Sequence, residues 1–247
     1  MDRIGVTSYL HRSGFRNLII DTSVDESRIN YFRLYDGNKT HERQLVDIRV
    51  SETVFIPERS LIPPEIEFTP YEMINIEWLS ARNPDRNDFD AKKPQLPGQE
   101  GPGLGIIKYC FNLLHLLTEE IYKDGFMDVP EHMHQAIMYS RKFMFFDPVH
   151  EAILRAVMRD LKKYSVYDIT WGIMTGTVIE KKSGLPQVYD PCEQIYPVSR
   201  RLKKYFRSRI YTETFKKFYG RKRYYLDYEE MDKRRGEIIS SIRIEDL

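Results

Sequence analysis

The sequence predicts an α+β protein with a globular composition. Three observations support this: β-branched and aromatic residues alternate in the first third, a proline- and glycine-rich loop follows, and helical patterns fill most of the remainder. The 247 residues are 41% hydrophobic and 30% charged, so the chain can bury a substantial core. No secretory or transmembrane pattern occurs, and Cys110 and Cys192 stand far apart, so we expect a cytoplasmic protein without disulfides.

Four segments of the first third are predicted strands of an antiparallel meander. Apolar residues alternate along several of them, and Asp36-Gly37-Asn38 supplies a turn. The segments are residues 16–23, 28–37, 44–57 and 71–79. Residues 42–55 also admit a helical face, so a helix there is the alternative to the third strand.

Residues 80–105 are predicted to form a loop, and helices dominate after it. Loops of this length in a compact domain are usually functional or disordered. Apolar residues spaced three and four apart predict a buried helix over 104–122, which Lys123-Asp124-Gly125 would end. Further expected elements are a short strand at 126–129, helices at 134–145 and 149–164, and a late strand at 171–180.

Residues 198–225, called the basic segment below, carry eleven lysines and arginines and one glutamate. Their net charge of +10 leaves −9 for the rest of a chain whose total is +1. We expect a domain over residues 1–180 and a basic, mostly helical C-terminal extension over 181–247. The interleaved aromatic and basic residues would suit nucleic acid, an acidic protein or anionic lipid. The alternative is that the aromatic residues pack inward beneath a solvated basic face.

The element order resembles the GNAT superfamily of acyl-CoA N-acyltransferases over about residues 40–147. The resemblance is carried by Gln99, Gly103 and Gly105 in the loop, by the strand FMDV, and by the helical segment AIMYSRKFMFF at 136–146. Glycine-loop N–H groups before a helix favour an anion such as a pyrophosphate. The resemblance implies a GNAT-like core that binds acyl-coenzyme A or an acyl carrier protein thioester. The implied binding residues are Gln99, Gly101, Gly103, Leu104, Gly105, Met127 and Val129.

The same resemblance implies acyl transfer to an amine or hydroxyl of a small-molecule or protein acceptor. Tyr139 would protonate the departing thiolate, and Glu131 or His134 would take a proton from the nucleophile. The alternative for each of these three residues is an ordinary structural role, such as a core tyrosine with a satisfied hydroxyl. The alternative function is a non-catalytic module whose basic segment holds an acidic protein, nucleic acid or anionic lipid.

Two other chemistries are less well supported by the sequence. A metal site is one interpretation of the pair His132 and His134 together with His150-Glu151. Zinc-like sites need three or four converging ligands, however, and capping of a helix N-terminus accounts for both histidines of the pair. We therefore expect no metal. The chain has neither a Gly-x-Ser-x-Gly motif nor a Gly-x-x-x-x-Gly-Lys-Ser/Thr motif. This argues against a serine hydrolase and against a P-loop phosphoryl transferase.

Overall fold

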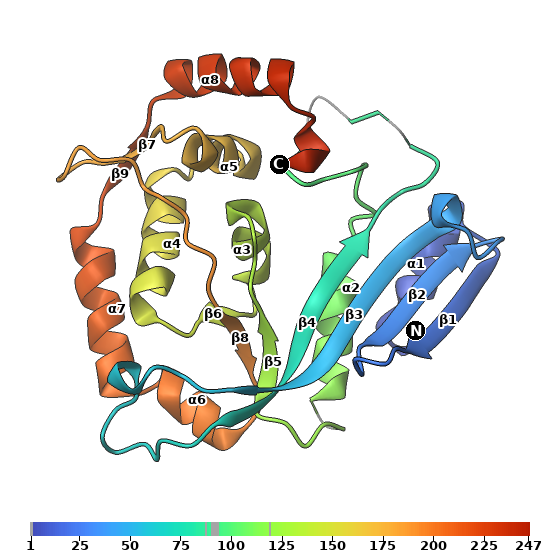
Figure 1. Cartoon of the computed structure of the whole chain (residues 1–247), viewed down its shortest axis with the longest axis horizontal. Coiled ribbons are helices and arrows are strands. Elements are labelled where there is room, and N and C mark those ends of the chain that lie inside the picture. Colours follow the sequence, from blue (N-terminus) through green and yellow to red (C-terminus); the bar gives the residue numbers. More distant parts are fainter. Residues whose placement is uncertain (1, 87, 90–93, 119) are drawn as a thin grey trace. The chain divides into compact units, whose positions relative to one another are not determined.

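The computed structural model describes residues 2–86, 88–89, 94–118 and 120–247. They form two compact units, each of which contains helices and strands, so the α+β class is confirmed (Figure 1). The division expected at residue 180 stays a prediction. Among the described residues, no helix is long and apolar enough to span a membrane. The first unit is Met1–Phe55, Pro70–Phe89 and Gly101–Phe126, and the second is Ile56–Thr69, Asp90–Glu100 and Met127–Leu247.

An antiparallel meander forms the sheet of the first unit. Its strands pair in chain order, and the first residues of the next strand, β5 (Gly125–Asp128), follow β4. All four predicted strands are confirmed, and the helix considered at 42–55 is wrong because this segment pairs on both sides. Gly37 lies in the turn that follows β2, with a φ of 86°, a conformation that favours glycine. The strands are β1 (Leu18–Val24), β2 (Asn30–Asp36), β3 (Gln44–Phe55) and β4 (Tyr71–Ala81).

Two α-helices occur in the described part of the first unit, α1 (Val6–Arg12) and α2 (Ile107–Leu117). Helix α1 was not predicted from the sequence. Helix α2 is shorter than the predicted helix over 104–122, of which residue 119 lies outside the described residues. It begins late because Leu104 still pairs with the end of β4, donating its N–H to the carbonyl of Ala81 at 3.0 Å. It ends where the Thr118 hydroxyl donates to the His115 carbonyl at 2.7 Å, a bond that competes with helical pairing.

Helices dominate the second unit, in which α7 packs against α4 (Figure 1). Trp171, fully buried, lies in its core with Phe145, Leu154 and Val157. Strands β6 (Met144–Phe145) and β8 (Gln194–Pro197) pair antiparallel, as do β7 (Val178–Glu180) and β9 (Tyr224–Leu226). The helices are α3 (Met133–Tyr139), α4 (Pro148–Asp160), α5 (Val166–Met174), α6 (Arg200–Phe206), α7 (Arg209–Arg221) and α8 (Tyr228–Ser241).

The strand predicted at 171–180 is wrong over most of its length, because α5 continues to Met174. The Ser165 hydroxyl accepts from the N–H of Asp168 at 3.1 Å, and the Asp168 carboxylate accepts from the N–H of Ser165 at 3.0 Å. This capping box starts the helix, and only the last three residues of the predicted strand form β7. The predicted helix at 134–145 also stops early, at Tyr139, and its last residues become β6.

Candidate functional site

The three residues predicted to be catalytic lie at or near α3 of the second unit. Glu131 precedes the helix and is exposed, His134 is buried in its first turn, and Tyr139 is its half-buried last residue. The Tyr139 ring packs against Phe143 with centroids 5.7 Å apart. At about 100° per residue, His134 and Tyr139 point about 140° apart around the helix axis. The helix therefore does not place these two side chains on one face.

Burial moves the pKa values of two neighbouring groups in opposite directions. Burial, then the charge of Glu131, raises the pKa of Asp128 to about 7, and burial, then His132, lowers the pKa of His134 to about 4. Near pH 7 the His134 ring is therefore mainly neutral, and the Asp128 carboxyl is partly protonated. Within the described chain, Asp128 Oδ2 and His134 Nδ1 are buried without a hydrogen-bond partner. His134 is a weak base here, and Asp128 is the group that titrates near pH 7.

Asp128 was not among the site residues predicted from the sequence. The signal was an acidic residue inside the predicted buried strand FMDV, since a carboxyl in a buried strand is expected to have an altered pKa. Of the two strand residues predicted to bind the thioester, Met127 is half-buried and Val129 is exposed. The Val129 amide hydrogen-bonds the Asp128 carboxylate, which opposes the increase in its pKa. That N–H is engaged within the protein.

The predicted cofactor loop is split between the two units, with Gln99 in the second and Gly101 to Gly105 in the first. Gln99 closes a local turn, since its side-chain oxygen accepts from the N–H of Leu96 at 3.1 Å and its carbonyl accepts from the Gln95 side chain at 2.7 Å. Gly98 in this turn has a φ of 68°, and a Cβ there would lie 3.0 Å from His132 Nε2.

The remainder of the loop extends the pairing of β4 in the first unit. Gly103 forms a bridge with Arg82, and the Leu104 N–H is bonded to Ala81. The Tyr9 hydroxyl donates to the Leu104 carbonyl at 2.8 Å, and Gly105 follows with a φ of 70°. A phosphate-binding loop needs N–H groups that point to the anion. In this conformation the Leu104 N–H serves the strand pairing instead.

His132 and His134 stack with ring centroids 5.4 Å apart and an interplanar angle of 13°. His132 precedes α3, and its N–H donates to the Gln135 side chain at 3.0 Å, which secures the start of the helix. No group of three or more histidine, cysteine, aspartate or glutamate side chains that could hold a metal ion occurs in the part of the chain that the structure describes.

A basic face on α6 is the most distinct charged feature of the second unit. Arg200, Lys203, Lys204 and Arg207 are all exposed and follow the i, i+3, i+4, i+7 spacing of one helical face. We call these four residues the α6 basic face. The opposite side of the helix buries Leu202, Tyr205 and Phe206, so packing fixes which way the cations point.

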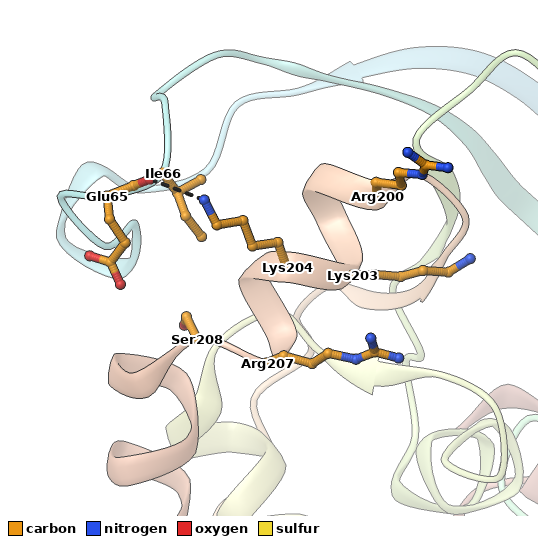
Figure 2. A pocket seen from close by; sticks show the side chains of 7 residues that line it. All are labelled: Glu65, Ile66, Arg200, Lys203, Lys204, Arg207 and Ser208. Carbon is orange, nitrogen blue, oxygen red and sulfur yellow. Dashed lines mark hydrogen bonds between the residues drawn. The ribbon is translucent and has the colours of Figure 1, made fainter.

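The α6 basic face borders a hollow of about 420 Å³. Figure 2 shows Arg200, Lys203 and Arg207 extending the same way from the helix, while Lys204 reaches toward the segment of Glu65 and Ile66. The Lys204 ammonium lies 3.5 Å from the Glu65 carbonyl oxygen. None of the four cations forms an ion pair with a side chain that the structure describes. The lining is Glu65, Ile66, Arg200, Lys203, Lys204, Arg207 and Ser208.

Two tyrosines of the basic segment pack inward. The Tyr205 ring stacks on Phe146 with centroids 4.2 Å apart, and its hydroxyl donates to the Phe146 carbonyl at 2.7 Å. Tyr211 is also buried, and its hydroxyl donates to the Phe145 carbonyl at 2.8 Å. The inward-packing alternative is therefore correct for these rings, which are not available for stacking on bases. The i, i+3, i+4, i+7 spacing of the four cations is the sequence pattern that could have predicted the α6 basic face.

Comparison of the chain with protein-family models, with curated proteins and with solved structures finds no match.

Proposed function

We propose that this chain is a binding protein whose partner carries phosphate groups and docks on the α6 basic face. The observation that carries the proposal is the set of four cations on one helical face, beside a hollow, with no ion pair to a described side chain. Arg200, Lys203 and Arg207 extend the same way from the helix, so their charges repel one another, and a polyanion relieves that repulsion. Arginine also matches phosphate geometry through two parallel N–H···O bonds.

Two neighbours of the cations affect the preferred ligand. Ser208 caps α7, where its oxygen accepts from the N–H of Tyr211 at 3.2 Å, and this bond leaves the hydroxyl hydrogen for another acceptor. Glu65, on the rim, opposes an anion. Because the rings of Tyr205, Phe206 and Tyr211 are buried, we infer that recognition rests mainly on charge, and we expect little dependence on nucleotide sequence.

The test is binding of a fluorescent oligothymidylate, measured by anisotropy at several salt concentrations. Each lost phosphate contact reduces the slope of log affinity against log salt by about 0.7 for a single strand. The double variant Lys203→Gln/Arg207→Gln should therefore lose about 1.4 from the slope and bind at least ~10-fold more weakly at low salt. Competition by inorganic tripolyphosphate tests whether phosphate alone is recognised.

The matched control is Lys216→Gln/Lys217→Gln on α7. It removes two exposed lysines from the same basic segment but leaves the α6 basic face intact. Equal losses in both double variants would mean that net charge alone attracts the probe. Absence of salt-dependent binding to the wild-type protein would refute the proposal.

Acyl transfer from a coenzyme A thioester is the second candidate, and Asp128 is the observation that favours it. A buried carboxyl with a pKa of about 7 can exchange a proton near neutral pH, as general acid–base catalysis requires. The test is thermal stability of the wild-type protein and of Gly103→Val with coenzyme A and acetyl-coenzyme A. A ligand at about 100 times its Kd should stabilise the protein by about 2.7 kcal/mol. No stabilisation would count against this candidate.

A further inference from the structure

A second concave site lies in the second unit, apart from the α6 basic face. It is a cavity of about 170 Å³ between α4, α5 and the chain segment Gln187 to Asp190. Phe145, Leu154 and Ile173 form part of its wall and are buried. A dry cavity of about 150 Å³ with a similar apolar lining holds a benzene molecule in another protein. The volume here therefore suits a body of about one six-membered ring.

The segment that borders the cavity is held in place on both sides. The Gln187 N–H donates to the Val178 carbonyl at 2.8 Å, and its side-chain oxygen accepts from the Tyr224 hydroxyl at 2.7 Å. The Tyr189 hydroxyl donates to the Pro130 carbonyl at 2.7 Å. Between them Val188 is largely exposed. These bonds preform the wall, which reduces the ordering that a ligand would have to impose.

One polar side chain in the wall has a fixed orientation. His150 Nδ1 lies 3.2 Å from Asp147 Oδ2, and Asp147 is itself fixed because its Oδ1 accepts from the N–H of Val149 at the start of α4. The bond to Asp147 directs Nδ1–H to the carboxylate and leaves Nε2 for another partner. His150 Nε2 is 3.9 Å from Asp190, a residue whose side chain is 80% exposed.

The charges around His150 decide which polar group a ligand can carry. The hydrogen bond that His150 donates to Asp147 raises the pKa of His150, and this effect outweighs burial, which lowers it. The charges there act against each other: the imidazolium repels an ammonium that Asp147 and Asp190 attract, and it attracts a carboxylate that they repel. Neither an ammonium nor a carboxylate therefore finds a purely favourable environment. A neutral hydroxyl suits both states of the ring, because it can donate to the neutral imidazole or accept from the imidazolium.

We propose that this cavity is a binding site for a small neutral ligand with a ring-sized apolar body and one hydroxyl group that faces His150. The site is independent of the α6 basic face and of the proposed function.

Titration of the full chain with phenol and with toluene, followed by ligand-observed NMR, tests the proposal. We expect saturable binding of both, whereas benzoate and benzylamine bind more weakly than phenol. His150→Leu should reduce the preference for phenol over toluene by about 3–10-fold, the value of one hydrogen bond. The matched control is His115→Leu, which replaces an exposed histidine outside the cavity and should leave the preference unchanged.

A second variant tests the cavity itself. Ile173→Phe adds volume to the wall and should abolish binding of both compounds while circular dichroism still reports a folded protein. If that variant does not fold, Ile153→Phe fills the same cavity from α4. The proposal is overturned if the wild-type protein binds neither compound, if a folded filled variant still binds phenol, or if His150→Leu keeps the original preference.

Discussion

Replacing Asp128 by asparagine should stabilise the protein at alkaline pH and have little effect near pH 4. The carboxyl has a pKa of about 7 when folded, whereas an unfolded chain gives an aspartate about 3.9. The proton therefore favours the folded state, and this contribution is lost as the pH rises from about 4 through about 7. Three pKa units at 1.36 kcal/mol each correspond to about 4 kcal/mol, the upper limit for the increase in stability of Asp128→Asn relative to wild type at about pH 8.

Urea denaturation at several pH values measures this difference. Trp171 is fully buried in the second unit and Trp78 is nearly half exposed in the first, so a Trp78→Phe background makes fluorescence report on the unit that contains Asp128. The comparison between Asp128→Asn and its parent cancels other titrating groups. Asp88→Asn, which removes an exposed carboxylate, is the control. A difference that is constant between pH 4 and 8, or that decreases with pH, would refute the reasoning.

Three further predictions concern the second unit. Gly172→Ala should destabilise it by about 1–3 kcal/mol, because a Cβ would lie 2.5 Å from Leu226 Cδ1 and 2.9 Å from Val178 Cγ2. Gly236→Ala on α8, where nothing lies within 4 Å, should instead stabilise by up to about 1 kcal/mol, and denaturation curves that rank the two variants the other way would contradict this. Arg155→Ala should destabilise the protein by about 1–3 kcal/mol, because it removes the cation that lies 2.7 Å from the buried Glu151 carboxylate. Arg209→Ala removes only an exposed ion pair and should lower the free energy of unfolding by less than ~1 kcal/mol. NMR titration should find the His134 ring neutral down to about pH 4. Its contribution to the free energy of unfolding should be lost as the pH falls from about 6.5 toward 4. A titration midpoint near 6.5 would show instead that the ring is solvated.

The strands of the first unit were predictable because alternation and turn residues agree with each other there. The helix α5 was not, because it is buried on most sides: Ile169, Thr170, Trp171, Gly172 and Ile173 are consecutive buried residues. Periodicity cannot distinguish such a helix from a buried strand. The sequence did contain the arbitrating signal, the pair Ser165 and Asp168 at capping-box spacing.

Site residues were harder to predict than elements. An Asp inside a short strand and four cations on one helical face are both visible in the sequence, but only tertiary burial makes Asp128 titrate near neutrality and directs the cations away from Tyr205 and Phe206. The Asp147–His150 pair is also local in sequence. Its relation to the cavity depends on residues about forty positions later, Gln187 to Asp190, which no local pattern connects to it.

The interleaving of the two units along the chain constrains how the protein can be made. Residues 56–69 connect β3 to β4 but belong to the second unit. Most residues of that unit come later in the chain, from Met127 onward. During synthesis, the first unit is complete only once residue 126 has left the ribosome, and by then the segment that carries Glu65 and Ile66 still awaits its partners. A gene cut at residue 126 would therefore leave the second unit incomplete in both fragments, and the fragment starting at Met127 would lack one wall of the hollow beside α6.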